Sequence, residues 1–168
     1  ILLLIVLTGL YFWAPSFNDF QVAGELALPG LKSKVTVQRD ENGMAYITAE
    51  NLEDALMAQG FVTAQDRLFQ MQVTRLLTQG RISELAGPDA RNLDIRMRTI
   101  GLHRMAKKHA AMLDDDTRLF FKQYVNGINA FIDACPDDIH LEFKLAGIEP
   151  EQWGIEDSLS ILYYMGYS

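Results

Sequence analysis

The side chains best suited to chemistry lie together between residues 60 and 87. Here an amphipathic pattern is interrupted by a carboxylate, two guanidinium groups and two amides, namely Asp66, Arg67, Gln70, Arg75 and Gln79. Such groups can form charge-assisted hydrogen bonds with a ligand or with another part of the protein. Their simplest interpretation is a solvated helix face with charge pairs along it. The alternative is a set of polar residues that serves recognition.

Nucleophilic and metal chemistry have no recognisable motif in this sequence. No Gly-x-Ser-x-Gly elbow or comparable turn could hold the nucleophile of a serine hydrolase triad. His103 and His109 are six residues apart and fall on different faces of a helix, which disfavours a shared metal. His140 and Glu142 offer two ligands without a third, so we expect them on a loop surface. The sequence therefore predicts neither a catalytic set nor a metal site.

Two further features also receive structural interpretations. The aspartates at 114–116 could suggest calcium, but they open an apolar periodic segment, and no loop with alternating ligands follows them. A helix cap explains them better. Cys135 is the only cysteine, which excludes a disulfide within the chain and a Cys-rich zinc motif. It precedes Pro136, and we expect a small half-buried side chain at a helix end.

Composition favours a globular protein and disfavours nucleic acid as a partner. The 168 residues are 49% hydrophobic and 22% charged, and 15 Lys and Arg against 22 Asp and Glu give a net charge of −7. A phosphate backbone would be repelled unless basic residues were segregated. The only basic cluster, around Arg104, Lys107 and Lys108, is interpreted as a solvated helix face.

The first residues predict export to the periplasm or another extracytoplasmic compartment. Residues 1–13 form an uncharged apolar run with aromatic residues at its end. The run is shorter than the roughly twenty residues of a spanning helix, but it lacks a small-x-small cleavage site before Pro15. We favour a membrane anchor in residues 1–14 over a cleaved signal peptide, and a buried helix is the third interpretation. Residues 15–24 then form a linker.

The folded part, residues 25–168, is predicted to begin with short strands. Strand-like residues occupy 26–28, 35–38 and 44–48, and Asn42-Gly43 suits the tight turn of a hairpin. Asn51 can cap a helix that extends to about Thr78, with carboxylates in its first turn.

Helices dominate the rest of the predicted fold. After Gly80 we expect a short helix over 81–86, a stop at Gly87-Pro88, one helix over 93–112 and another that begins at 114–116. Residues 136–152 are expected to be irregular, with Trp153 as an anchor against the helices. A last helix begins near Asp157 and is apolar on most sides, so we expect it to be deeply packed or covered by further chain.

Read together, these segments resemble the start of the penicillin acylase family of N-terminal-nucleophile hydrolases, which mature by cutting their own precursor. The similarity extends from about residue 24 to the end. Its landmarks are residues 28–31, 35–49, 60–87 and 147–150, with Trp153 and Asp157. The residues assigned to the family signature are Asp40, Gly43, Gln65, Asp66, Arg67, Gln79 and Gly80. Residues 44–47 depart from the family, whose members usually have a Pro-His pair before the isoleucine.

The resemblance implies a fold and an activity. The fold would be α+β: a mainly helical fragment with a short N-terminal β-hairpin, part of an αββα structure that downstream chain completes. The activity would be hydrolysis of a linear amide, in a penicillin-like or other N-acyl substrate, through an acyl-enzyme. The nucleophile would be a serine that opens a second, β subunit, with its own α-amino group as the base. The fragment alone should then be inactive.

The resemblance also assigns roles to residues of this chain. Met165, Gly166 and Tyr167 fall where the family's substrate-pocket residues begin. No cofactor is expected in this fragment, and the calcium-binding glutamate of some members would lie just beyond Ser168. Asp66 and Arg67 are expected to tie the long helix to the opening strands or to the β subunit, so Arg67→Met should impair maturation or stability.

A second hypothesis from another class is a membrane-tethered helical binding module without catalytic activity. It predicts that residues 24–168 form a monodisperse domain when expressed alone. An acylase fragment should instead aggregate, because its last helix would expose apolar side chains.

Overall fold

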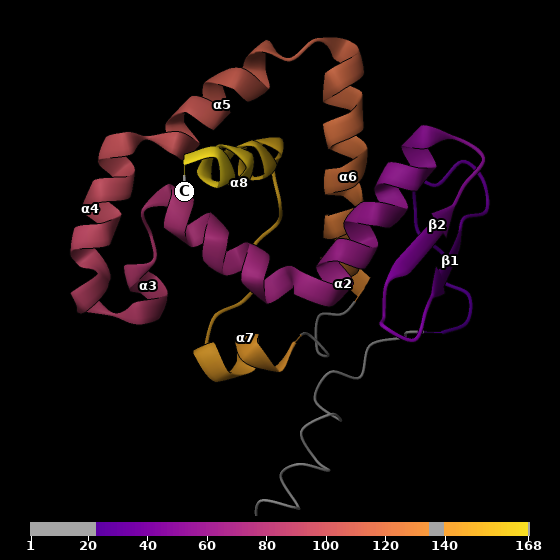
Figure 1. Cartoon of the computed structure of the whole chain (residues 1–168), viewed down its shortest axis with the longest axis horizontal. Helices are drawn as coiled ribbons and strands as arrows, with labels where there is room; N and C mark the ends of the chain where they lie inside the picture. The colour runs from indigo at the N-terminus through magenta and orange to yellow at the C-terminus, as the bar shows by residue number, and fades with distance from the viewer. Residues whose placement is uncertain (1–22, 135–139, 168) are drawn as a thin grey trace, which may run out of the picture.

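The computed structural model describes residues 23–134 and 140–167 (Figure 1). The predicted anchor or signal segment at 1–14, most of the predicted linker, and Cys135 with Pro136 lie outside these residues. Within the described part, no helix is both long and apolar enough to cross a membrane. The architecture is mainly helical with one small antiparallel sheet, as the sequence predicts.

The sheet is a hairpin of β1 (Thr36–Arg39) and β2 (Ala45–Thr48), in which Val37 pairs with Ile47. Asp40 closes the turn, because its Oδ1 accepts backbone hydrogen bonds from Asn42 and Met44, each at 2.9 Å. Gly43 supplies a φ of +79°, which residues with a Cβ rarely adopt. The predicted hairpin is thus confirmed.

The expected strand at residues 26–28 is wrong. The structure assigns no strand there, since this segment lies outside the ladder that β1 and β2 form. Leu28 instead packs against the hydrophobic core. Its apolar character reflects contact with helices rather than membership of a sheet.

The central element is α2 (Leu52–Gln79), which is capped by Asn51 as predicted. The Asn51 side chain accepts a hydrogen bond from the Asp54 backbone N–H at 2.8 Å. Arg67 has φ −143° and ψ 17°, which are non-helical values, so α2 is kinked at this residue. The helix ends at Gly80, whose φ of +66° is left-handed.

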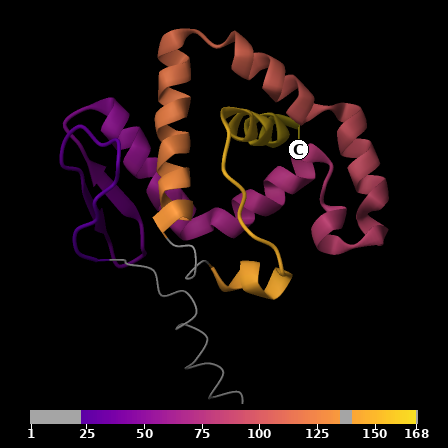
Figure 2. The same ribbon diagram turned by 180° about the vertical axis from the view of Figure 1, so that it is seen from behind.

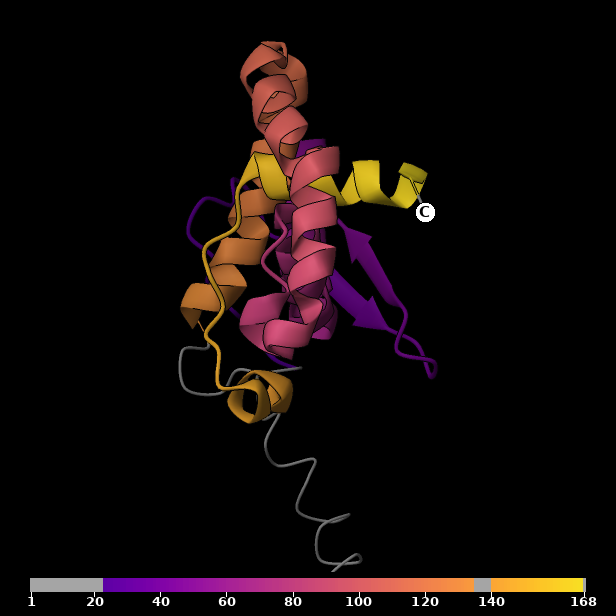
Figure 3. The same ribbon diagram turned by 90° about the vertical axis from the view of Figure 1, so that its left-hand side faces the viewer.

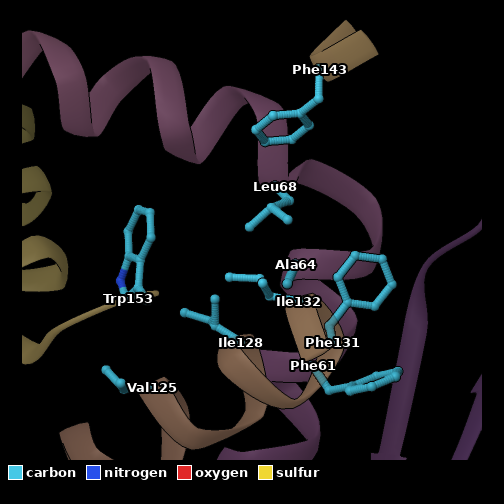
Figure 4. Close-up of a cluster of buried hydrophobic side chains, with 9 residues drawn as sticks. All are labelled: Phe61, Ala64, Leu68, Val125, Ile128, Phe131, Ile132, Phe143 and Trp153. Atoms are coloured by element: carbon cyan, nitrogen blue, oxygen red, sulfur yellow. The ribbon is translucent and has the colours of Figure 1, made fainter. Parts of the chain in front are cut away.

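The core forms where α6 (Asp115–Ala134) crosses the first half of α2. Figure 4 shows apolar side chains from both helices converging there, joined by Trp153 and Phe143. The rings of Phe61 and Phe131 meet edge to face, with centroids 5.5 Å apart. The buried members of this cluster are Phe61, Ala64, Leu68, Val125, Ile128, Phe131, Ile132, Phe143 and Trp153.

The segment after α2 forms a curved helical arm, which is seen from behind in Figure 2. It comprises α3 (Ser83–Ala86), the 3-10 helix η2 (Pro88–Ala90), α4 (Arg91–Ile100) and α5 (Leu102–Met112). The prediction of one helix over 93–112 is wrong. Gly101 adopts a φ of +78°, which ends α4 and turns the chain into α5.

The C-terminal part contains α7 (Leu141–Ala146) and α8 (Ile155–Tyr167). The prediction that residues 136–152 are irregular misses α7, whose Phe143 is buried in the core. A helix of one to two turns carries too few residues for a clear periodicity. α8 packs along α5 and on α2, and Figure 3 shows its C-terminal end projecting away from α5 and α6.

Candidate functional site

Polar side chains from distant parts of the chain meet α2 at its kink and at its C-terminal end. At the kink, the Arg39 guanidinium donates to both carboxylate oxygens of Asp66, from Nη1 to Oδ2 at 3.0 Å and from Nη2 to Oδ1 at 2.8 Å. Arg39 also donates to Gln65 Oε1 at 2.8 Å and to the carbonyl of Gly43 at 2.9 Å. These bonds join the end of β1, the hairpin turn and the middle of α2. We call this group the hairpin tether.

Asp66 and Arg67 are expected to tie the long helix to the opening strands or to the β subunit, and the hairpin tether makes the first of these links through Asp66. Asp66 contacts Arg39, whereas Arg67 is exposed at the kink. Within the described residues no hydrogen bond or ion pair is found for the Arg67 side chain. The sequence did not indicate Arg39, because a contact across 27 positions leaves no local pattern.

We therefore expect Arg39→Met to lower the free energy of unfolding of the full-length protein by about 1 kcal/mol, since a partly exposed bidentate ion pair is lost. Arg67→Met removes the same charge one residue from Asp66 and should change it by less than about 0.5 kcal/mol. Urea unfolding of both variants measures the difference. Equal losses would show that the Arg67 side chain has a partner outside the described residues, as a contact with the β subunit would provide.

The second group surrounds Arg75, a charged side chain that is only 1% exposed. Its Nη2 donates to Gln72 Oε1 at 2.6 Å, and its Nη1 donates to the carbonyl of Gln152 at 3.0 Å. The guanidinium also lies 4.9 Å from the ring centroid of Trp153, a cation–π distance. Burial lowers the pKa of Arg75, and the carboxylates of Asp157 and Glu151 oppose that shift.

Two carboxylates of the described residues lie 3.5 Å from the Arg75 guanidinium, and Asp157, in the first turn of α8, is the buried one, whereas Glu151 is exposed. Asp157 Oδ2 lies 3.5 Å from Arg75 Nη1 and accepts the backbone N–H of Gly154 at 2.9 Å. Its Oδ1 accepts from Gln79 Nε2 at 3.0 Å. One carboxylate therefore caps α8 and fixes it to the end of α2. We call Arg75, Asp157, Gln72, Gln79 and Trp153 the α2–α8 clamp.

The remaining predicted signature residue at this end, Gly80, has a steric role. A Cβ at this position would lie 2.7 Å from the backbone oxygen of Asp94. Gly80 therefore allows α4 to pass close to the end of α2.

The sequence singled out Arg75, Gln79, Trp153 and Asp157 separately but did not bring them together. The only signal was that Gln72 and Arg75 share the helix face of Leu68 and Leu76, at intervals of three and four residues. Polar residues on a buried face require buried partners. The partners of Arg75 on α8 lie about eighty residues further along the chain. No local sequence pattern indicates that these two segments meet.

His103, on α5, contacts the edge of the clamp. Its Nδ1 is buried, has no hydrogen-bond partner among the described residues, and lies 3.9 Å from Asp157 Oδ1. Burial lowers the pKa of His103, Asp157 raises it in part, and Lys107, Glu156 and Arg75 make smaller contributions. The folded protein therefore binds a proton at this ring less readily than the unfolded chain does.

This pKa shift predicts a pH dependence of stability. As pH falls below the ordinary histidine value of about 6.5, the unfolded state takes up a proton that the folded state resists, so stability decreases. His103→Gln should reduce the loss of thermal stability between about pH 7.5 and pH 5.5. His109→Gln, at an exposed ring whose Nδ1 lies 2.6 Å from Tyr163 Oη, is the control. Identical pH profiles for wild type and His103→Gln would contradict the assignment.

His140 is buried, which corrects its expected position on a loop surface. Its Nε2 lies 2.8 Å from the carbonyl oxygen of Gln65, and its ring packs near Phe131 and Phe143. The ring therefore satisfies a backbone group near the kink of α2. No group of three potential metal ligands occurs in the part of the chain that the structure describes.

The aspartates at 114–116 behave as a helix start. Asp114 Oδ1 accepts the backbone N–H of Thr117 at 2.9 Å, as expected for a cap. That hydrogen bond lowers the pKa of Asp114.

The expected pocket residues lie together at the end of α8. Met165 is 70% exposed and Tyr167 50% exposed, and a Cβ at Gly166 would meet no atom of the described residues within 4 Å. Arg96 Nη2 donates to Tyr167 Oη at 3.3 Å, which links α4 to this end of α8. The clamp holds the buried start of α8, whereas the pocket candidates stand at its open end.

The serines on α8 take part in structural hydrogen bonds. Ser158 Oγ accepts from the Trp153 indole at 2.9 Å, and buried Ser160 pairs with Thr78 at 3.1 Å. A pocket of about 380 Å³ lies between α2 and residues 23–39. Its lining is mostly apolar, and its polar members Arg39 and Gln65 are engaged in the hairpin tether. Among the described residues, most of the polar side chains considered above form structural contacts, and the C-terminal end of α8 is exposed.

Comparisons with known proteins identify a family and several relatives with similar sequences. A family model described as Penicillin amidase matches residues 34–168. The chain is 38% identical over 145 residues to penicillin acylase 2 proenzyme of Pseudomonas sp. (strain SE83), covering 86% of this chain and 19% of that protein. It is 37% identical over 147 residues to acyl-homoserine lactone acylase QuiP of Pseudomonas syringae pv. syringae (strain B728a), covering 88% and 18%.

A solved structure shares the fold as well. Thermostable penicillin G acylase from Alcaligenes faecalis superimposes with a TM-score of 0.69 at 28% identity, over 77% of this chain and 70% of that chain. The present chain spans about a fifth of the length of the curated relatives that it matches.

Proposed function

Because the chain belongs to the penicillin amidase family, we propose that it is the amino-terminal part of an acylase that hydrolyses a linear amide between an acyl group and an amine. The observation that carries this proposal is the family match over residues 34–168, together with the shared fold of a penicillin G acylase. Relatives named as penicillin and acyl-homoserine lactone acylases support an N-acyl substrate.

In this proposal the reaction itself takes place on the β subunit of the same precursor. Its first residue, a serine, attacks the amide carbonyl while its own α-amino group, with an ordinary pKa near 8, accepts the proton. The amine leaves, and water then releases the acyl group from the serine. A relative named as a proenzyme supports maturation from a precursor.

In this proposal the described residues position the substrate and do not transfer protons. Met165, Gly166 and Tyr167 form part of the acyl-pocket wall, because they lie at the open end of a helix whose start is fixed by buried polar contacts. The β subunit covers the exposed apolar side chains of α8, which include Leu162 at 55% exposure. An exposed apolar stripe of this kind commonly marks an interface.

We also propose that the enzyme works outside the cytoplasm and that residues 1–13 direct its export or anchor it. The support is the uncharged apolar character of this run. Sequencing the amino terminus of the mature protein tests the two forms. A start near residue 20 would exclude the anchor.

The activity is tested with the full-length precursor. Expression should yield two chains, and the purified protein should release free amine from N-acyl substrates, including penicillins and N-acyl homoserine lactones. Replacing the serine that opens the second chain with alanine should abolish both cleavage and turnover. An intact precursor that releases no amine would refute the proposal.

A further inference from the structure

We propose that Arg75 is a positioning residue: by holding the first turn of α8 on α2, it sets the place of the helix end that carries Met165 and Tyr167. The inference rests on the proposed function, since it gives these residues a role at the acyl pocket. In this inference the buried Arg75 affects which acyl groups the enzyme prefers, although its side chain does not itself bind the substrate.

The first step of the argument is the way α8 is held. Asp157 meets Arg75 and Gln79, and Ser160 meets Thr78, so α8 and α2 are joined by side-chain contacts over one turn. Ser160 is completely buried and Thr78 is 1% exposed. Buried hydrogen bonds of this kind fix one arrangement, because any other would leave polar groups unpaired.

The second step concerns the segment that leads into α8. Arg75 donates to the carbonyl groups of Glu151 and Gln152, and its guanidinium stacks near Trp153. The Trp153 backbone N–H in turn donates to Asn129 Oδ1 on α6 at 2.7 Å. Arg75 therefore fixes both the entry of the chain into α8 and the direction in which the helix leaves.

The third step concerns how far the end of α8 moves when the angle of the helix changes at the clamp. Met165 lies eight residues beyond Asp157, which corresponds to about 12 Å along a helix. A change of about 5° in the angle at the clamp would move Met165 by about 1 Å, and a displacement of this size can change kcat/KM by up to about 100-fold. The last residues of α8 include several exposed side chains, and further polar contacts there join Tyr163 to His109 and Tyr167 to Arg96.

The chemistry at the clamp requires arginine. A guanidinium can donate to Gln72, to two carbonyl groups and to Asp157 at once because its donors are arranged as a planar fork. A lysine keeps the charge but offers a single ammonium group at the end of a flexible stem. Arg75→Lys should therefore preserve folding better than an apolar substitution, and yet loosen the angle of α8.

The test uses the full-length, matured enzyme and a homologous series of straight-chain N-acyl para-nitroanilides together with the phenylacetyl compound. For Arg75→Lys we expect the ratio of kcat/KM between long and short acyl groups to change by about 10-fold, mainly through KM. Thr78→Val, which removes the buried contact with Ser160 at the same turn, should change the ratio in the same direction by about 3-fold.

Arg39→Met is the matched control, because it loses an arginine ion pair on α2 at the hairpin tether, away from α8. Its ratio should stay within about twofold of wild type even if its melting temperature falls. Active Arg75→Lys and Thr78→Val enzymes with the wild-type ratio would overturn the inference. If Arg75→Lys does not accumulate, Thr78→Val decides the question alone. A wild-type enzyme that hydrolyses neither this series nor penicillins and N-acyl homoserine lactones would refute the proposed function instead.

Discussion

Replacing Gly127 with alanine should destabilise the protein by about 3 kcal/mol or prevent it from folding. A Cβ at Gly127 would lie 1.9 Å from the backbone oxygen of Met57, and one at Gly60 would lie 2.0 Å from the backbone oxygen of Tyr124. The two glycines thus bring the backbones of α2 and α6 into direct contact. A clash with backbone cannot be relieved by a change of rotamer, so the helices themselves would have to separate and open the core.

Gly60→Ala should have a similar effect, since it touches the same crossing from the other helix. Gly166→Ala is the matched control, because a Cβ on this helical glycine would meet no atom of the described residues within 4 Å, so the crossing of α2 and α6 should stay intact. Soluble yield and the urea midpoint of the full-length protein measure all three variants. A Gly127→Ala protein with wild-type yield and midpoint would show that α2 and α6 do not approach this closely.

The second large effect is expected for Arg75→Met, which should lower the free energy of unfolding by about 3–5 kcal/mol. The substitution leaves the Asp157 carboxylate buried without its cation and removes donors from the carbonyl groups of Glu151 and Gln152. Most of this loss of stability comes from leaving the Asp157 carboxylate buried without a partner. The net free energy contributed by the ion pair itself is smaller. Arg39→Met, at a partly exposed pair, is expected to cost far less.

A double-mutant cycle separates these contributions. Asp157→Asn keeps an oxygen for the Gly154 N–H and removes the negative charge, so the double variant with Arg75→Met should be more stable than Arg75→Met alone. Urea unfolding of the wild type, both single variants and the double variant gives the coupling energy. If the two losses simply add, Asp157 is not the group that makes the Arg75 substitution costly.

Local patterns account for the elements that the sequence predicted well. Asn42-Gly43 determined the hairpin through a backbone conformation that glycine adopts easily, and Asn51 marked the start of α2 by its capping side chain. The apolar period of residues 115–134 likewise matched the helix face that meets α2. Each of these features depends on residues a few positions apart.

Two of the errors, at Leu28 and His140, have the same physical cause: the position of each residue is decided by contacts with residues distant in the sequence. Leu28 looked like part of a strand, but it is apolar because it packs on the core. His140 looked like a surface residue, yet it is buried beside Gln65, far away in the sequence. The break at Gly101 is a local feature: glycine ends α4 in a left-handed conformation, and its backbone N–H donates to the carbonyl of Met97.

The sequence by itself determined the family resemblance, the predominance of helices, the hairpin and some of the polar residues that the scaffold uses, among them Asp66, Arg75 and Gln79. It did so because periodicity, capping and turn preferences act over short separations. Only the tertiary structure decided that Asp66 binds Arg39, that Arg67 stands free of the hairpin tether, and that Arg75 clamps α8 to α2. A buried charge requires a partner, because an unpaired charge is costly to remove from water. Which residue becomes that partner depends on the packing of distant segments in the folded protein.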